Sequence, residues 1–444
     1  MKLLIPLGTL CLGFIGHAAL AADGDLDPAF SNDGQAVVTW PYSISGARVA
    51  VAADGSLFHV VTEARDTGEI NQDFAISKLR PDGTLDPTFG FFGQRTVGFD
   101  IVTDGIDRVL GVFPLADGGV LLAGTAQTDV DSASYRPPGL IRLTASGDAD
   151  PTFGDNGRRV IGGKPWMDSV GFDWNAVVRQ PDGKLVFAGD CFNCEGARLA
   201  VALRVTENGD IDATFGDGGW FSLETEHSIK IGAVAVDPWN RILLGGSTET
   251  DADPDDRPWL ARTTPEGDLD LTFGMLSGYS FLADVPSAGG DWYTTSIAID
   301  SDGSIVLALS NSGAGIARTV SDGSLDNSFA DGGFLDLIRE NGADIRAVAI
   351  RGDHRIMAAG GINHTGGDYD NYIARVLPDG TLDPTFDSNG LVRVNVIAGA
   401  NDSASAMAFA AGRPVVAGRG GADLDTGTLL RFESDLIFAN GCGD

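Results

Sequence analysis

The chain is a succession of short apolar runs separated by turns rich in Gly, Asp and Pro. Residues 158–206 contain four such runs, RRVIGG, AVVRQ, KLVFAGD and LAVALRVT, with the turn PDG between the second and the third. Apolar runs bounded by these residues are typical of β-strands, and Pro-Asp-Gly favours a tight turn. Residues 333–377 repeat the plan with GFLDLI, RAVAI, RIMAAG and YIARVL. Each stretch of this kind is predicted to form four short strands.

A ten-residue motif punctuates these units and occurs seven times. The copy PDGTLDPTFG at 81–90 returns almost unchanged as PDGTLDPTFD at 378–387. All copies share an aromatic residue, at intervals of 56 to 64 residues: Phe30, Phe89, Phe153, Phe215, Phe273, Phe329 and Phe386. All share an aspartate three residues before it: Asp27, Asp86, Asp150, Asp212, Asp270, Asp326 and Asp383. A glycine lies six residues before each Phe, and in six copies a Lys or Arg lies eleven residues before it.

The period and the strand count together predict the architecture. Four antiparallel strands repeated at roughly 40–60 residues are the pattern of a propeller blade. The units start near residues 30, 89, 153, 215, 273, 329 and 386. We therefore expect an all-β fold, a seven-bladed β-propeller of four-stranded antiparallel blades that spans residues 22–434 as one domain. A β-helix is the rival architecture, in which each unit would have to hold several dissimilar rungs.

The motif and its flanking strands resemble a known repeat. DGTLDPTFG, with QPDGKLVFAG at 180–189 and YIARVLPDGTLD at 372–383, looks like the delta-60 repeat of secreted bacterial proteins. The resemblance covers essentially all of the chain after residue 21 and implies a β-propeller-type fold, but no agreed activity. Departures are local: Asn208 replaces the usual Asp, Ser277 stands where Gly is expected, and the last unit loses the motif after Asp435.

The two ends of the chain differ from the repeats. Residues 1–21 combine a basic start at Lys2, an apolar run and the small-x-small sequence Ala19-Leu20-Ala21. This pattern predicts a Sec signal peptide that is cut after Ala21. We therefore expect the mature protein to be secreted or periplasmic, and the sequence leaves that choice open. Residues 435–444 form a C-terminal tail to which the pattern assigns no role.

The charge of the chain narrows the class of partner. The formal net charge is −32, from 62 acidic and 30 basic residues. An acidic surface of this size repels phosphate backbones, so nucleic acid and anionic membranes are not expected partners. No later stretch is long and apolar enough to predict a membrane span. The protein is expected to be a monomer.

The repeated motif is predicted to be structural. Gly83 permits a positive φ, Asp86 can accept backbone N–H bonds in an Asx-turn, and Phe89 can bury its ring between adjacent sheets. The cationic residue eleven positions before the Phe can pair with a carboxylate of the turn. We interpret the motif as the connector between blades. The alternative is a set of seven calcium or sugar sites, but local hydrogen bonding explains all seven copies without a ligand.

Closure of the ring makes a separate prediction. The first copy has no strand before it, and the last unit has a strand carrying Arg431 but no motif after it. The two half-motifs complement each other. Asp27 and Phe30 are therefore expected to lie beside the strand that carries Arg431.

Function is expected where the units differ. In antiparallel blades the variable loops share one face of the propeller, and the DG turns and motifs share the other. Five aromatic residues fall in variable loops: Trp40, Trp166, Trp174, Trp292 and Tyr293. Exposed rings suit sugar stacking or peptide contact. Rings that plug the ends of the blades are the alternative.

Two further groups of residues suggest chemistry in these loops. Four carboxylates, Asp251, Asp253, Asp255 and Asp256, offer the oxygen ligands that calcium prefers, but lack the fixed Gly and Glu of an EF-hand loop. A solvated acidic loop is the alternative, so no cofactor is expected apart from possible calcium. Cys191 and Cys194 are predicted to form a small loop disulfide in an oxidising compartment.

Two functions from different classes fit these patterns. The first is a non-catalytic scaffold that binds a glycan, a peptide or a partner protein through the variable face. The second is a secreted carbohydrate-active hydrolase or lyase that uses carboxylates on the same face. The histidines form no metal-binding pair, and the chain contains neither a GxSxG elbow nor a phosphate-binding loop. Catalysis is therefore the second choice, and no catalytic residue can be named.

Overall fold

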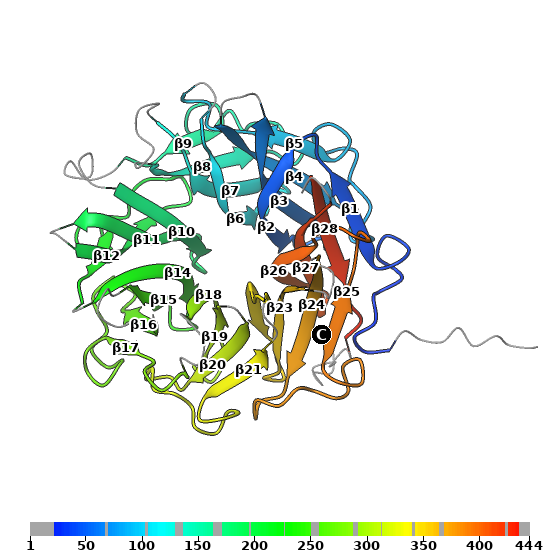
Figure 1. The fold of residues 1–444 in the computed structure, drawn as a ribbon. Coiled ribbons are helices and arrows are strands. Elements are labelled where there is room, and N and C mark those ends of the chain that lie inside the picture. Colours follow the sequence, from blue (N-terminus) through cyan, green and yellow to red (C-terminus); the bar gives the residue numbers. More distant parts are fainter. Residues whose placement is uncertain are drawn as a thin grey trace, which may run out of the picture.

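Seven four-stranded antiparallel sheets are arranged around a central axis in the computed structural model (Figure 1). The structure describes residues 22–434 except 67–69, 103–104, 129–135, 163–170, 195–196, 226, 250–256, 287–291, 312, 340–341, 364–367 and 422–424. The predicted fold class, a seven-bladed β-propeller, is confirmed. None of the described segments is a helix long and apolar enough to cross a membrane.

Each blade runs from an inner to an outer strand, and we number the blades I to VII. Blade I contains β2 (Ser43–Val51), β3 (Leu57–Asp66), β4 (Ile70–Leu79) and β5 (Gln94–Val97). Blade II contains β6 (Arg108–Pro114), β7 (Val120–Thr125), β8 (Pro138–Leu143) and β9 (Arg158–Val160). Blade III contains β10 (Gly171–Arg179), β11 (Leu185–Cys194), β12 (Ala197–Val205) and β13 (Trp220–Leu223).

The next three blades follow the same order. Blade IV contains β14 (Ser228–Val236), β15 (Ile242–Glu249), β16 (Pro258–Thr263) and β17 (Tyr279–Phe281). Blade V contains β18 (Tyr293–Ile299), β19 (Ile305–Ser310), β20 (Ala314–Thr319) and β21 (Phe334–Ile338). Blade VI contains β22 (Ala347–Ile350), β23 (Ile356–Asn363), β24 (Tyr369–Val376) and β25 (Leu391–Val394).

Blade VII draws its strands from both ends of the chain. It contains β26 (Ser403–Ala410), β27 (Arg413–Gly420), β28 (Thr426–Arg431) and, as its outer strand, β1 (Gln35–Thr39). β1 pairs antiparallel with β28, so the first strand of the chain completes the last blade (Figure 1). The ring is closed by hydrogen bonds rather than by the covalent chain.

The blades are offset by one strand from the units expected from the sequence. Residues 158–160, expected to open a unit, form the outer strand of blade II. The interpretation of the motif as a connector between blades is therefore wrong: it joins the third and fourth strands of one blade, as residues 80–93 do between β4 and β5. The sequence repeat was counted from the aromatic residue of each motif. The boundary of a blade is set by which strands are hydrogen-bonded to each other, and sequence spacing does not reveal that.

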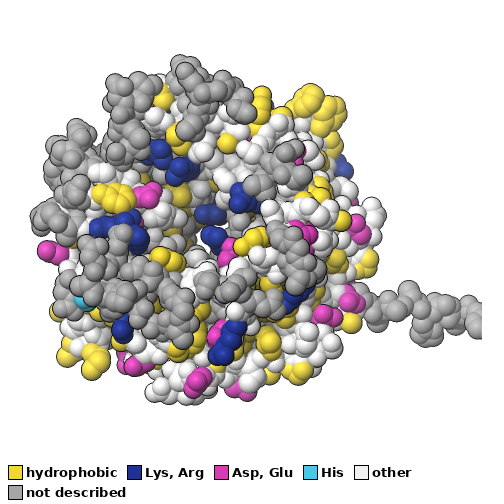
Figure 2. All heavy atoms as spheres, viewed as in Figure 1, with side chains coloured by type: hydrophobic (Ala, Val, Ile, Leu, Met, Phe, Trp, Pro, Cys, Tyr) yellow, Lys and Arg dark blue, Asp and Glu magenta, His cyan; other side chains and the backbone are white. Residues whose placement is uncertain are grey.

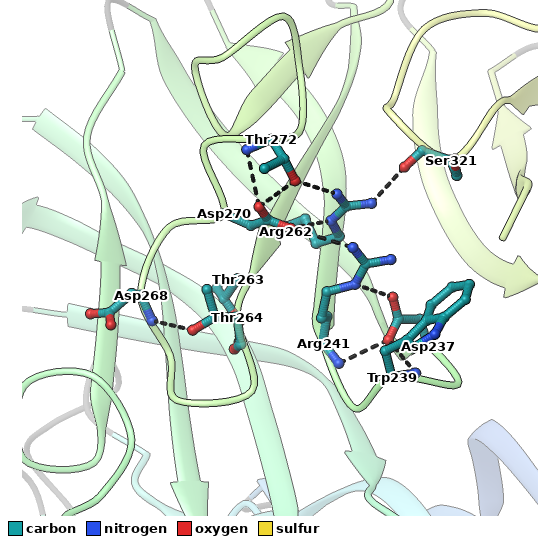
Figure 3. Close-up of polar contacts among 10 residues, drawn as sticks. All are labelled: Asp237, Trp239, Arg241, Arg262, Thr263, Thr264, Asp268, Asp270, Thr272 and Ser321. Carbon is teal, nitrogen blue, oxygen red and sulfur yellow. Dashed lines mark hydrogen bonds and ion pairs between the residues drawn. The ribbon is translucent and has the colours of Figure 1, made fainter.

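Within each motif the aspartate holds the turn and binds the cation. Asp270 Oδ1 accepts the N–H of Thr272 at 3.0 Å and its hydroxyl at 2.6 Å, while Oδ2 accepts Nε of Arg262 at 2.7 Å (Figure 3). The guanidinium stacks 4.6 Å from the centre of the Phe273 ring. The same stacking, at 4.6 to 4.8 Å, joins four other pairs: Arg204 with Phe215, Arg318 with Phe329, Arg375 with Phe386, and Arg431 with Phe30.

The motifs of neighbouring blades also contact each other. Arg262 donates a hydrogen bond to the carbonyl of Ser321 in the next motif (Figure 3). The backbone of the residue after the Phe donates to a carbonyl of the next copy at six of the seven junctions, for example Gly274 N to Asp322 O at 2.8 Å. We call this ring of seven motifs the girdle.

The invariant glycine is required by this contact. Gly323 has φ of 89°, and a Cβ added there would lie 2.5 Å from the ring of Phe273 in the preceding motif. A side chain would therefore be strained by the backbone and blocked by the neighbouring blade. Each Phe ring packs between its own blade and the next, which explains why both residues recur in every copy.

All seven motif aspartates have lowered pKa values. For Asp270, burial alone would raise the pKa, but hydrogen bonds from Thr272 and the hydrogen bond and charge of Arg262 outweigh it. Hydrogen bonds and positive charge favour the ionised form. The girdle therefore holds its carboxylates charged at neutral pH.

The expected closure contacts are present. Arg431 Nε donates to Asp27 Oδ2 at 2.6 Å, and Asp27 N donates to the carbonyl of Arg431 at 2.8 Å. Leu26 forms a β-bridge with Phe432, and the ring of Phe30 is fully buried. The first copy of the motif thus makes the same contacts in blade VII that the other copies make between the third and outer strands of their own blades.

The girdle predicts a stability difference between two arginines that hold the same position in their motifs, of which only Arg262 stacks on its Phe. The side chain of Arg262 is 4 % exposed, whereas that of Arg142 in blade II is 26 % exposed. Arg262→Met leaves a poorly solvated carboxylate and should lower the free energy of unfolding by about 3 kcal/mol. Arg142→Met should cost about 1 kcal/mol. Denaturant unfolding of both variants measures the difference, and equal losses would contradict the role given to burial.

The closure predicts a second effect. Deleting residues 23–34 should lower Tm and promote association, because blade VII loses the anchor of β1. Phe30→Ala tests the ring alone and should cost about 3–5 kcal/mol. Val37→Thr is the control, since Val37 lies on β1 but is 52 % exposed. Thermal unfolding and size-exclusion chromatography measure both effects; a deleted protein that melts like the parent as a monomer would contradict this closure.

Candidate functional site

A funnel opens at the centre of one face of the propeller. Its lining comes from all seven inner strands and the segments before them, for example residues 175–177 of β10 and 230–234 of β14, and from the ends of second strands at Ser247 and Ser310; its volume is about 1240 Å³. Each inner strand begins on the face that carries the loops between second and third strands and the crossings between blades. We call this the variable face, and the funnel therefore opens on it.

Three rings of residues line the funnel from mouth to floor. The mouth ring is chemically diverse: Ser45, Asp173, Lys230, Tyr293, Asp344 and Ser403 line the funnel, while Arg108 holds the matching strand position in blade II but lies outside the lining. The middle ring is small except at one position: Arg48, Gly111, Ala176, Ala233, Ser296, Ala347 and Ala406. The floor ring is aliphatic: Val49, Val112, Val177, Val234, Ile297, Val348 and Met407. The blades therefore agree at the floor and diverge toward the mouth.

A β-bulge in the inner strands aims side chains into the funnel. The register shifts between Trp174 and Ala176 in β10, and a comparable shift occurs in the inner strands of five other blades. The bulged Asn175 donates to the carbonyl of Ile231 in the next blade at 3.0 Å. In blade V the bulged Thr295 donates to the carbonyl of Ile345 at 2.6 Å. Bulges commonly re-aim side chains next to functional sites.

Positive charge gathers in this funnel although the protein is acidic. Five cationic side chains are among the described lining residues: Arg48, Arg198, Lys230, Arg346 and Arg419. Three carboxylates accompany them: Asp173, Asp190 and Asp344. Figure 2 shows Lys and Arg side chains around the central hollow. The local balance is the reverse of that in the whole chain, where acids outnumber bases by about two to one.

Two of the three carboxylates are held by neighbouring arginines. Asp190 pairs with Arg198 at 2.9 Å, and Asp344 pairs with Arg346 at 2.9 Å. Asp190 also accepts the backbone N–H of Ile231 through its other oxygen. Burial raises the pKa of Asp190 to about 6, against the lowering effect of these partners. Asp173 lies directly opposite Asp190 across the β10–β11 ladder and is exposed.

Most of the aromatic residues that were expected to be exposed on this face are buried. Trp40, Trp174 and Trp292 are 4 %, 4 % and 7 % exposed. Trp174 stacks on Phe172 at 5.9 Å, and Trp292 packs edge-on to Phe334 at 5.3 Å. The interpretation of these three rings as exposed sugar-stacking residues is therefore wrong, because they fill the cores between blades. Tyr293 is 41 % exposed and lines the funnel.

The other sequence candidates are partly outside the described residues. Trp166, Asp251, Asp253, Asp255 and Asp256 all lie in undescribed loops, so the calcium hypothesis stays a prediction. Cys191 and Cys194 form a disulfide at the end of β11. Among the described residues, no three His, Cys, Asp or Glu side chains lie close enough together to hold a metal ion.

Sequence reasoning missed the arginines of the funnel. The signal was available: position by position, Arg48 stands where the six other inner strands carry Gly, Ala or Ser. An alignment based on the motif does not compare equivalent positions of the inner strands between units. The propeller places these strands around one axis, so a single large residue in one unit faces all the others.

Comparison with known proteins agrees with the architecture. Residues 60–89, 115–153, 180–215 and 352–386 match the family model described as "Domain of unknown function (DUF5122) beta-propeller". The chain is a β-propeller repeat protein. The four matches cover less than half of it and fall within blades I, II, III and VI, each ending at the Phe of a motif. The comparison with curated proteins gives no match.

Solved structures are similar only at a low level. YCF48 from Cyanidioschyzon merolae is 15 % identical, with 90 % of this chain and 99 % of that chain covered and a TM-score of 0.45. Penicillium chrysogenum alpha-L-arabinanase complexed with arabinobiose is 12 % identical, with coverage of 73 % and 92 % and a TM-score of 0.47. Trypanosoma rangeli sialidase in complex with the inhibitor DANA is 10 % identical, with coverage of 89 % and 56 % and a TM-score of 0.44. These scores carry no argument about ligand or activity.

The raised pKa of Asp190 predicts a specific pH dependence. A carboxyl with a folded pKa of about 6 and an unfolded pKa near 3.8 binds more protons when folded, so its contribution to stability is present below pH 3.8 and lost as pH rises to about 6. Asp190→Asn removes this contribution. Relative to the variant, the parent should lose about 3 kcal/mol between pH 3.8 and pH 7. Denaturant unfolding across this range measures the difference; a pH-independent difference would contradict the shift.

Proposed function

We propose that this protein is an exported, non-catalytic scaffold that binds a glycan, a peptide or a partner protein through the variable face. The observation that carries the proposal is the funnel, in which seven similar blades share a floor but present different side chains at the mouth. A concave site with an apolar base and a few polar groups around its rim is the usual form of a ligand site. Its volume exceeds what a single small molecule requires.

Membership of the delta-60 repeat family and export are part of the same proposal. The motif DGTLDPTFG and its spacing support the family. The apolar leader at residues 1–21 supports export, and so does the Cys191–Cys194 disulfide, since disulfides persist in oxidising compartments. Detection of the mature N-terminus in a culture supernatant or periplasmic extract would test this part.

The surroundings of the carboxylates favour binding over catalysis. A general acid must reach its substrate within hydrogen-bond distance. Asp190 is 1 % exposed, and both of its oxygens already accept hydrogen bonds, from Ile231 and from Arg198. These bonds join β11 to β12 and to the next blade. Asp190 is therefore better explained as a structural brace than as an acid that protonates a leaving group.

A carbohydrate-active hydrolase or lyase is the second candidate. The observation in its favour is the cross-strand pair of Asp173 and Asp190, because one carboxyl with a pKa of about 6 beside an exposed one resembles an acid and base division of roles. Asp173→Asn distinguishes the candidates. Release of reducing ends from a polysaccharide by the parent, abolished in Asp173→Asn, would establish the hydrolase.

Blocking the funnel tests the binding proposal. Ala176 is half-buried in the middle ring, and Ala176→Trp should fill the funnel without disturbing the blade cores. We expect ligands identified on glycan and peptide arrays to bind Ala176→Trp at least about tenfold more weakly, as judged by titration calorimetry. Val320→Trp, at a 38 % exposed position on the opposite face, is the control. Equal binding by both variants and the parent would place the ligand outside the funnel.

A further inference from the structure

Three arginines of the funnel stand where the repeat requires no charge. Arg48 replaces the small residues of the middle ring. Arg346 directly precedes Ala347, at a position occupied elsewhere by Ala47, Leu110, Asn175, Gly232, Thr295 and Ser405. Arg419 lies opposite Ser403, where the other second strands carry Thr62, Thr125, Asp190, Ser247, Ser310 and Gly361. No other blade needs an arginine at these positions to fold.

The three arginines come from consecutive blades. Arg346 belongs to blade VI, Arg419 to blade VII and Arg48 to blade I, and all three line the funnel. Burial, and next the charge of Arg346, lower the pKa of Arg48, which places the two cations within electrostatic range of each other. We call this group the arginine arc.

Two members of the arc have no carboxylate partner in the described part of the chain. Arg48 donates Nε to the carbonyl of Leu110 at 2.8 Å and Nη1 to that of Ala47 at 3.0 Å. Arg419 donates Nη1 to the carbonyl of Ile44 at 3.3 Å. These bonds orient each guanidinium and leave its charge uncompensated. Buried or half-buried cations without an anion are costly, so this arrangement points to a ligand that brings one.

We infer that the arginine arc binds the oxyanion group of an acidic saccharide, with the sugar lying across the mouth of the funnel. The inference rests on the proposed function and names the ligand class of that site. Guanidinium groups form bidentate hydrogen bonds with carboxylate, sulfate and phosphate oxygens. Because the outer surface is acidic and repels anions, the cationic funnel also favours an anion small enough to fit inside it.

The rest of the mouth suits sugar hydroxyls. Asn311 and Asn401 supply amide groups, Ser45 supplies a hydroxyl, and all three line the funnel. The exposed ring of Tyr293 offers a face on which a pyranose can stack. A long nucleic acid is a poorer fit, because its run of phosphates would extend over the acidic outer surface, whereas a short oligosaccharide can lie within the funnel.

The test compares charged and neutral saccharides of similar length. Calorimetry with the purified protein would use oligogalacturonate, a sulfated oligosaccharide, a phosphorylated oligosaccharide and a neutral oligosaccharide of similar length. We expect at least one charged oligomer to bind about tenfold more tightly than the neutral one and to weaken as salt is raised. The charged oligomer that binds identifies the oxyanion as carboxylate, sulfate or phosphate.

Variants assign the binding to the arc. Arg48→Gln and Arg419→Gln should each weaken binding of the charged oligomer by about tenfold or more, with little change for a neutral one. Arg339→Gln is the control, because Arg339 is 84 % exposed and lies outside the funnel lining. Unchanged Tm values would show that the variants fold, and Arg346→Gln offers a third position if one does not.

The two proposals fail in different ways. If neutral and charged oligomers bind equally and the arginine variants do not matter, the ligand class inferred here is wrong while the binding scaffold stands. If Ala176→Trp also leaves all binding unchanged, the funnel itself is not the site. Tight binding of single-stranded nucleic acid, lost in Arg48→Gln, would overturn the saccharide in favour of a phosphate backbone.

Discussion

The stacking of an arginine on a phenylalanine, with an aspartate bound to its edge, is the interaction on which this propeller depends. It recurs in five of the seven blades with similar geometry, and a backbone N–H links the motif to the next copy at six of the seven junctions. In blade II, Arg142 pairs with Asp150 without stacking on Phe153, and blade I replaces Arg by Lys78, whose Nζ lies over Phe58 instead. The girdle tolerates these weaker junctions because every blade is also held by the apolar cores on both of its faces.

Placing the girdle on one face frees the other. The turns of the girdle face are short, most of them place a glycine at positive φ, and the motif glycines lie against the neighbouring blade. The crossings and long loops of the variable face carry no such constraint. Bulges in the inner strands then direct their side chains toward the axis, so substitutions in single blades converge on one funnel. A site with sevenfold backbone symmetry thereby acquires an asymmetric charge distribution, with the arginine arc on one side and Asp173 on another.

The sequence was sufficient for the fold and insufficient for the site. Seven copies of one motif specified the blade count, and the incomplete motifs at the two ends specified closure through Asp27, Phe30 and Arg431. The blade boundary was misplaced by one strand because the repeat length does not show at which strand a blade begins. The pairing of β4 with β5 shows that the strand after the motif belongs to the same blade. The tryptophans were misjudged because a loop position does not determine exposure: Trp174 is covered by Phe172 and Trp220. Arg48 was overlooked because its importance arises from seven strands that are far apart in the chain.

The pairing of β1 with β28 has a consequence for how the molecule comes apart. In an open array of repeats the terminal units have one neighbour each, so they fray first and the interior outlasts them. Here both termini belong to the same blade, and every blade has two neighbours. Unfolding of any one blade exposes the apolar faces of both neighbouring blades. A partly unfolded ring therefore has little free-energy advantage over the completely unfolded chain. The ring is therefore expected to resist local opening and proteolytic trimming from its ends.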